Sequence, residues 1–174
     1  MPDVLTHVLV GYVVGALVAT RFEDVGPAGV TLVMAGALSP DFVKVKLLAP
    51  APYVEAALGI PFSWAPIHAV GGAAIVALLA GVFVGEEHRR TAVALVALGA
   101  ATHLFLDGLL VTPTGYAGQF LVPFSPYRAP AGMLYLSSDR WPAVVAGVAA
   151  ACVRAWRRYR NRQEAVTRSA TRRR

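Results

Sequence analysis

The stretch TAVALVALGAATHLFLDGLLV, residues 91–111, decides the fold of this chain. A transmembrane helix needs about 20 mostly apolar residues, and this stretch supplies that length. It also contains His103 and Asp107, which are four positions apart and therefore lie on one face of a helix. Ionisable side chains are costly inside a membrane and mark a functional position by default. The stretch therefore predicts a transmembrane helix that carries part of a site.

Four further apolar segments continue the pattern along the chain. They are residues 4–20, 28–39, 66–84 and 142–156. Residues 28–39 are too short to cross a membrane alone, so this segment either stops as a partial span or continues past Pro40 to Leu48 with a kink. We predict an all-α fold, an integral membrane helical bundle of four to five transmembrane helices within residues 1–156.

The composition agrees with a membrane protein. Of the 174 residues, 56% are apolar and 15% are charged, and the mean hydropathy is +0.56. Soluble domains are about one quarter charged, so a soluble domain is not expected. Disordered chains combine low hydrophobicity with high charge, so the composition excludes that class as well.

The net charge of +6 first suggests a nucleic-acid-binding protein, but its distribution does not. Residues 154–174 contain nine arginines and one acid, a net charge of +8, whereas residues 1–153 carry −2. We expect an Arg-rich cytoplasmic tail over residues 157–174, because basic residues are enriched on the cytoplasmic side of membrane proteins. Attraction to anionic lipid headgroups is the preferred explanation of this tail. A docking arm for nucleic acid or a protein partner is the alternative.

A cytoplasmic tail also sets the orientation of the whole chain in the cell membrane. Five spans would place residues 21–27 and 85–90 inside, and the N-terminus and the long connections 41–65 and 112–141 outside. Both connections are rich in aromatic residues, so they are either linkers at headgroup level or a lid over a substrate. Four basic residues on the outer side oppose this orientation: Lys44, Lys46, Arg128 and Arg140.

Under this orientation, the ionisable residues of the apolar segments all gather on the outer side of the membrane. Each alone has an ordinary explanation, such as an interfacial histidine or a buried hydrogen bond. Their convergence from four segments favours a metal site instead. Imidazoles and carboxylates without a thiolate suit zinc, with manganese or iron as alternatives. The candidate ligands are His7, Asp41, His68, His103 and Asp107.

Five short motifs in this order resemble a known family, the YdjM-type membrane-bound, metal-dependent hydrolases, which are also described as LexA-regulated or LexA-binding inner-membrane hydrolases. The motifs are THVLVG (6–11), GALSPD (36–41), PIHAVGG (66–72), GAATHLFLDGLL (99–110) and TPTGYAGQFLVPFS (112–125). More distantly, the pattern is similar to zinc-dependent phospholipase C and P1-type nucleases. The resemblance implies that the five candidate ligands occupy the metal-site positions of the family. It also implies hydrolysis of a phosphodiester or a phospholipid.

The sequence departs from the family pattern at two positions. Val43 stands where the family usually has a second acid, and Ser63 stands where it usually has a further histidine. The remaining set therefore suits one metal ion, or two ions that share a carboxylate.

We expect His68, His103 and Asp107 to hold the metal ion, with His7 completing the site or holding a second ion. A bound ion lowers the pKa of its water toward about 7, and Asp41 would bridge or act as general base on that water. The expected partners are membrane lipid and a lipid-like or phosphodiester substrate, not nucleic acid. Two other functions stay open, namely an intramembrane metal or proton transport protein and a structural protein with a degenerate site.

Overall fold

The computed structural model describes residues 4–22 and 24–171, and in these residues every regular element is a helix. The predicted all-α fold is therefore confirmed. The elements, in chain order, are α1 (Val4–Arg21), α2 (Pro27–Leu38), the 3-10 helix η1 (Ser39–Leu47), α3 (Ala51–Leu58), the 3-10 helix η2 (Ala65–His68), α4 (Val70–Val82), α5 (Glu86–Gly108) and α6 (Trp141–Thr171).

Three helical segments of the described chain are long and apolar enough to cross a membrane. They are Val4–Arg21, Pro27–Leu47 and Glu86–Gly108, and the shorter apolar helix Val70–Val82 accompanies them. Large apolar side chains cover the outer surface, including Ile75, which is 61% exposed, and Phe83, which is 85% exposed. Exposed apolar patches of this kind suit contact with lipid.

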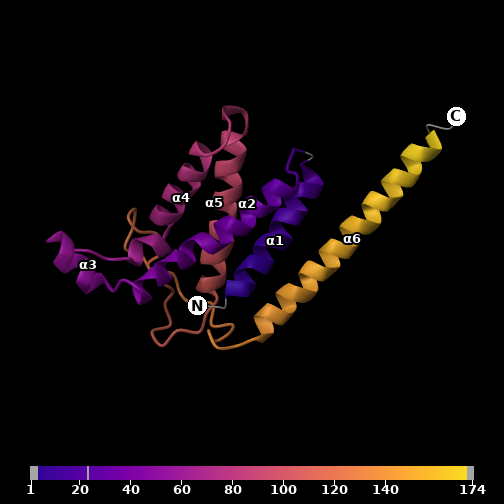
Figure 1. Ribbon diagram of the computed structural model, residues 1–174. Helices are drawn as coiled ribbons and strands as arrows, with labels where there is room; N and C mark the ends of the chain where they lie inside the picture. Colours follow the sequence, from indigo (N-terminus) through magenta and orange to yellow (C-terminus); the bar gives the residue numbers. More distant parts are fainter. Residues whose placement is uncertain (1–3, 23, 172–174) are drawn as a thin grey trace.

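Helix α6 begins where the fifth apolar segment was predicted but differs from the other spans. Its apolar run ends at Arg154, after 13 helical residues, and the helix continues without interruption to Thr171. Ala146 and Ala150 are buried, whereas Ala151, Cys152 and Arg154 are exposed. The first half of α6 therefore packs on α1, and the second half leaves the bundle (Figure 1).

Pro40 decides how the second segment ends. The proline has no N–H to donate and its ring clashes with the preceding turn, so an α-helix does not continue through it. The chain instead changes from α2 into η1, and together they form one apolar segment of 21 residues. Of the two predicted alternatives, the structure therefore has the continuation past Pro40.

The two long connections have different structures. Residues 41–65 contain most of η1 and all of α3, whose residues are all at least partly exposed and which lies away from the bundle (Figure 1). Residues 112–140 contain no helix. An isolated bridge between Leu110 and Tyr135 joins this second connection to the end of α5, and a second bridge, between Tyr116 and Pro130, lies within the connection.

Two glycines allow α2 and α5 to cross in direct backbone contact. A Cβ atom on Gly36 would collide with the carbonyl oxygen of Val96, and one on Gly99 would collide with that of Val33. Close packing of this kind is typical of helices in membranes. Because His103 follows Gly99 by one turn, the crossing places its ring beside the last turn of α2.

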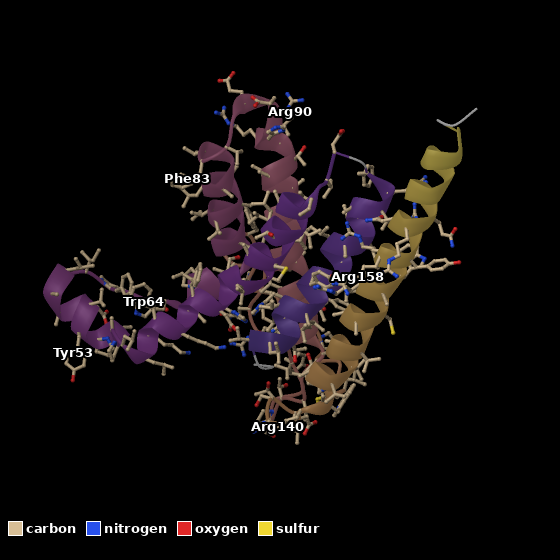
Figure 2. All side chains as sticks on the ribbon, turned by 45° about the vertical axis from the view of Figure 1, so that its right-hand side comes forward. Tyr53, Trp64, Phe83, Arg90, Arg140 and Arg158 are labelled. Carbon is tan, nitrogen blue, oxygen red and sulfur yellow. The ribbon has the colours of Figure 1, made fainter. Side chains whose placement is uncertain are left out.

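The ends of the bundle differ in what they carry. The α1–α2 and α4–α5 connections and the C-terminal end of α6 lie at one end, and the start of α1 lies at the other (Figure 1). Arg90 and Arg140 mark these opposite ends in Figure 2. The buried polar residues of the described chain come from the start of α1, the α2–η1 junction and the last turns of α5, at the Arg140 end: Thr6, His7, Ser39, Asp41, His103 and Asp107.

Candidate metal centre

Helix α5 supplies the middle of the candidate site. His103 is fully buried and Asp107 is 4% exposed, one turn further along the helix. The Nδ1 atom of His103 lies 2.7 Å from the carbonyl oxygen of Ala37. A carbonyl oxygen only accepts, so Nδ1–H donates this bond and Nε2 is the nitrogen that faces Asp107. Nε2 lies 3.5 Å from Oδ2 of Asp107.

Helix α1 brings His7 against this pair. Its ring stacks on the ring of His103, with the centroids 3.7 Å apart and the planes at 15°. Its Nε2 atom lies 3.5 Å from Oδ1 of Asp107, and His7 is fully buried. Within the described chain, neither ring nitrogen of His7 makes a hydrogen bond. A buried imidazole with both nitrogens unsatisfied is costly, so the site needs a further group there.

His68 approaches Asp107 from the opposite side of the carboxylate, after η2. Its Nδ1 atom lies 3.2 Å from the carbonyl oxygen of Pro40, and its Nε2 atom lies 2.7 Å from Oδ2 of Asp107. A carbonyl oxygen only accepts, so Nδ1–H donates to Pro40, and Nε2 is the nitrogen that contacts the carboxylate. This short contact joins His68 to Asp107.

The spacing of the buried atoms fits a metal ion. His7, His103 and Asp107 each offer a ligand atom, and these atoms all lie within 4.8 Å of one another. Two ligands at about 2.1 Å from a tetrahedral ion are about 3.4 Å apart. The separations here are close to that value, 3.5 Å from His7 Nε2 to Oδ1 of Asp107 and 3.5 Å from His103 Nε2 to Oδ2. The atoms that such an ion would satisfy, His7 Nε2, His103 Nε2 and Asp107 Oδ1, are buried and make no hydrogen bond with the described residues.

His68 and Asp107 are too close for both to bind one ion through the contacting atoms. Their separation of 2.7 Å is a hydrogen-bond distance, shorter than the spacing of two ligands. The structure thus groups His7, rather than His68, with His103 and Asp107. From the sequence we expected His68 to be a ligand and His7 to complete the site, and that assignment stays a prediction.

Asp41, the fifth predicted residue, lies in the first turn of η1. Its Oδ2 atom accepts a hydrogen bond from Nζ of Lys44 at 2.8 Å, and its Oδ1 atom is buried without a hydrogen-bond partner among the described residues. Asp41 also interacts electrostatically with His7. The structure brings all five predicted residues to one end of the bundle, with Asp41 beside the histidine and Asp107 cluster.

Sequence reasoning missed Tyr135, in the long connection after α5. Its hydroxyl donates a hydrogen bond of 2.6 Å to the carbonyl oxygen of Leu106, next to Asp107. Burial, with a smaller contribution from the charge of Asp107, raises the pKa of Tyr135 to about 12. The only signal in the sequence was the aromatic content of residues 112–141.

A cavity of about 450 Å³ opens beside His68. Its lining comes from three separate parts of the chain: Val43, Lys46, Ser63, Ala65, Pro66, His68, Gly118, Gln119, Phe120, Val122 and Arg128. His68 also contacts the ring of Phe120, with centroids 5.8 Å apart. Because His68 is 17% exposed while His103 is fully buried, it is the histidine through which the cavity meets the cluster.

Comparison with known proteins gives one family. The model of the family described as YdjM inner membrane protein matches residues 1–170, nearly the whole chain. No curated protein and no solved structure matches the chain.

Proposed function

We propose, from the premise that this chain belongs to the YdjM inner membrane protein family, that it is a membrane-bound metal-dependent hydrolase. The observation that carries the proposal is the buried cluster of His7, His103 and Asp107. The Nε2 atoms of both histidines lie 3.5 Å from an oxygen of Asp107 and make no hydrogen bond with the described residues. A divalent ion, zinc in the first instance, satisfies these atoms and supplies an activated water for hydrolysis when bound.

The residues around the cluster suit that chemistry. The hydrogen bond from Nδ1 of His103 to Ala37 fixes the ring so that Nε2 faces the cluster. His68 orients the carboxylate of Asp107 in the same way. One buried oxygen of Asp41 makes no hydrogen bond with the part of the chain that the structure describes, so we assign Asp41 the role of general base.

The substrate reaches this site from the membrane surface. The cavity beside His68 lies at the end of the bundle. Part of its lining comes from the connection after α5, and exposed apolar residues such as Leu121 and Phe124 lie in that connection. A phospholipid or another phosphodiester at the interface is the substrate that the family resemblance favours. We place this end of the bundle on the outer face of the membrane, with the Arg-rich end of α6 in the cytoplasm.

The distribution of buried polar residues favours hydrolysis over transport. A transport pathway needs polar groups that continue through the membrane. In the described chain, the buried polar side chains lie at the site end, and the core toward the other end is apolar, with Val25, Val33 and Leu95.

Elemental analysis of the purified protein tests the proposal. We expect about one divalent ion per chain in the wild type and little in His103→Gln or Asp107→Asn. His88→Gln is the control, because His88 is exposed and lies in the first turn of α5, at the opposite end of the helix from Asp107. Melting curves of all variants separate lost metal from lost folding. If the wild type stays metal-free in the presence of added zinc, manganese and iron, the proposal is wrong.

A further inference from the structure

We infer that the cavity beside His68 binds an anionic phosphoryl group through Lys46 and Arg128. The inference rests on the proposed function, because it names the part of the substrate that this end of the site recognises. It gives a function to Lys46 and Arg128, two basic residues that lie on the outer side of the membrane against the expected orientation.

The cavity has the size and position of a ligand site. Its volume of about 450 Å³ lies within the range of about 300–1,000 Å³ that small-molecule sites occupy. Lys46 comes from η1, Arg128 comes from the connection after α5, and His68 lies between these parts in the sequence. The fold therefore brings two cations from distant segments into the lining of one cavity, together with His68.

The positive charge of this cavity is not neutralised. No acidic residue lines it, and within the described chain neither Lys46 nor Arg128 has a carboxylate within 4.0 Å. Lys44, two residues before Lys46, shows the contrast, because its ammonium lies 2.8 Å from Asp41. An anion that enters the cavity therefore meets two cations that no carboxylate of the described residues has already paired.

The mixture of donors suits a phosphoryl group. Arginine presents a planar fork to two oxygens, and lysine adds a point charge, so the pair can meet a group that has several anionic oxygens. Ser63 and Gln119 add neutral polar side chains to the same lining. A phosphoryl group held there lies beside His68, which is bonded to Asp107 at 2.7 Å.

A second cavity extends the site toward apolar walls. It has a volume of about 370 Å³ and shares Val43, Lys46, Ser63 and Ala65 with the first, so the two adjoin. Its remaining lining is Pro50, Ala51 and Trp64. The anion is therefore placed where an attached apolar chain also has room, which favours a lipid phosphate over free phosphate.

Binding measurements on the full-length protein in neutral detergent test the inference. Calorimetry would follow short-chain dihexanoyl phosphatidic acid and inorganic phosphate, with the protein as purified and again after metal removal by a chelator. We expect Lys46→Gln and Arg128→Gln each to weaken binding about tenfold, the loss of one charge-assisted contact. Arg140→Gln is the matched control, since it removes a cation from the same end of the bundle but does not line the cavity.

The outcomes distinguish a lipid headgroup from a phosphoryl group alone, and they decide whether the inference is correct. Equal effects on both probes mean that the phosphoryl group suffices, and effects on the lipid alone identify a lipid headgroup. Both results support the site. If neither probe responds to the two substitutions, or if Arg140→Gln weakens binding as much, the inference is wrong. Binding to metal-free protein does not depend on hydrolysis, so a chain that binds the anion but hydrolyses nothing contradicts only the proposed function.

Discussion

Asp107 is the residue at which the three histidines meet, and they lie at two different distances from it. Its Oδ2 atom lies 2.7 Å from His68 and 3.5 Å from His103, and its Oδ1 atom lies 3.5 Å from His7. The first distance is that of a hydrogen bond, and the second is the spacing of two ligands on one ion. The three histidines should therefore differ in how strongly they affect metal binding.

Substitution of single histidines tests this difference. We expect His7→Gln to lower zinc affinity by more than about 100-fold, because it removes a ligand, and His68→Gln to lower it about tenfold, the size of an effect on ligand orientation. Competition with a chromogenic chelator measures both. Equal losses in the two variants, or a larger loss in His68→Gln, would show that the histidines have the opposite roles.

Tyr135 gives a prediction about pH. Its pKa is raised from 10.0 to about 12, so the folded state holds this proton more tightly than the unfolded state does. The stability that this provides is complete below pH 10 and is lost as the pH rises toward 12. Absorbance at 295 nm should show one of the six tyrosines ionising late, and Tyr135→Phe should remove that late step. An unchanged titration of the variant would contradict the assignment.

The sequence was sufficient to identify the five candidate residues, because ionisable groups are rare in apolar segments. It was not sufficient to assign their roles. Which nitrogen of His103 or His68 faces Asp107 depends on the carbonyl oxygens of Ala37 in α2 and Pro40 in η1, which are distant in sequence from both histidines. The Lys44–Asp41 pair likewise depends on the turn that η1 makes after Pro40.

Among the elements, the crossing of α2 and α5 has the tightest geometry. Gly99→Ala would place a methyl group against the backbone of α2 and separate the helices. We expect a loss of about 1–3 kcal/mol in unfolding free energy, the usual cost of overpacking, and weaker metal binding because His103 moves away from Ala37. Thermal melts and zinc titration of the same variant measure the two effects.

Gly147→Ala is the control for that substitution. A Cβ atom at Gly147 would meet only Cδ1 of Leu9, at an ordinary 3.9 Å. This variant should keep the stability and metal affinity of the wild type. If Gly99→Ala is tolerated equally well, the crossing does not hold the site in place.

The helices themselves were predictable to the extent that each is one apolar run. Residues 91–111 match the second part of α5, and residues 4–20 match α1. The helix α3 within residues 41–65 was not expected, because this connection has no continuous apolar run. The cavity was also beyond sequence reasoning, since its walls come from three segments that only the fold brings together.

For the whole molecule, the orientation in the membrane can be measured directly. In a Cys152→Ala background, we would introduce Ser137→Cys at the site end and Glu87→Cys at the opposite end. If the Arg-rich end of α6 is cytoplasmic, an impermeant maleimide should label position 137 in intact cells and position 87 only after permeabilisation. The reverse pattern would place the candidate site on the cytoplasmic face.

Helix α4 has a consequence for the surrounding lipid. It has 13 residues, and at 1.5 Å per residue it is about 20 Å long, against about 30 Å for the hydrocarbon core of a bilayer. A bilayer accommodates a short apolar helix partly by thinning around it. Because α4 follows directly after His68, the thinned patch would adjoin the cavity and bring lipid headgroups nearer to it. Acyl chain length would then affect access to the site independently of headgroup chemistry.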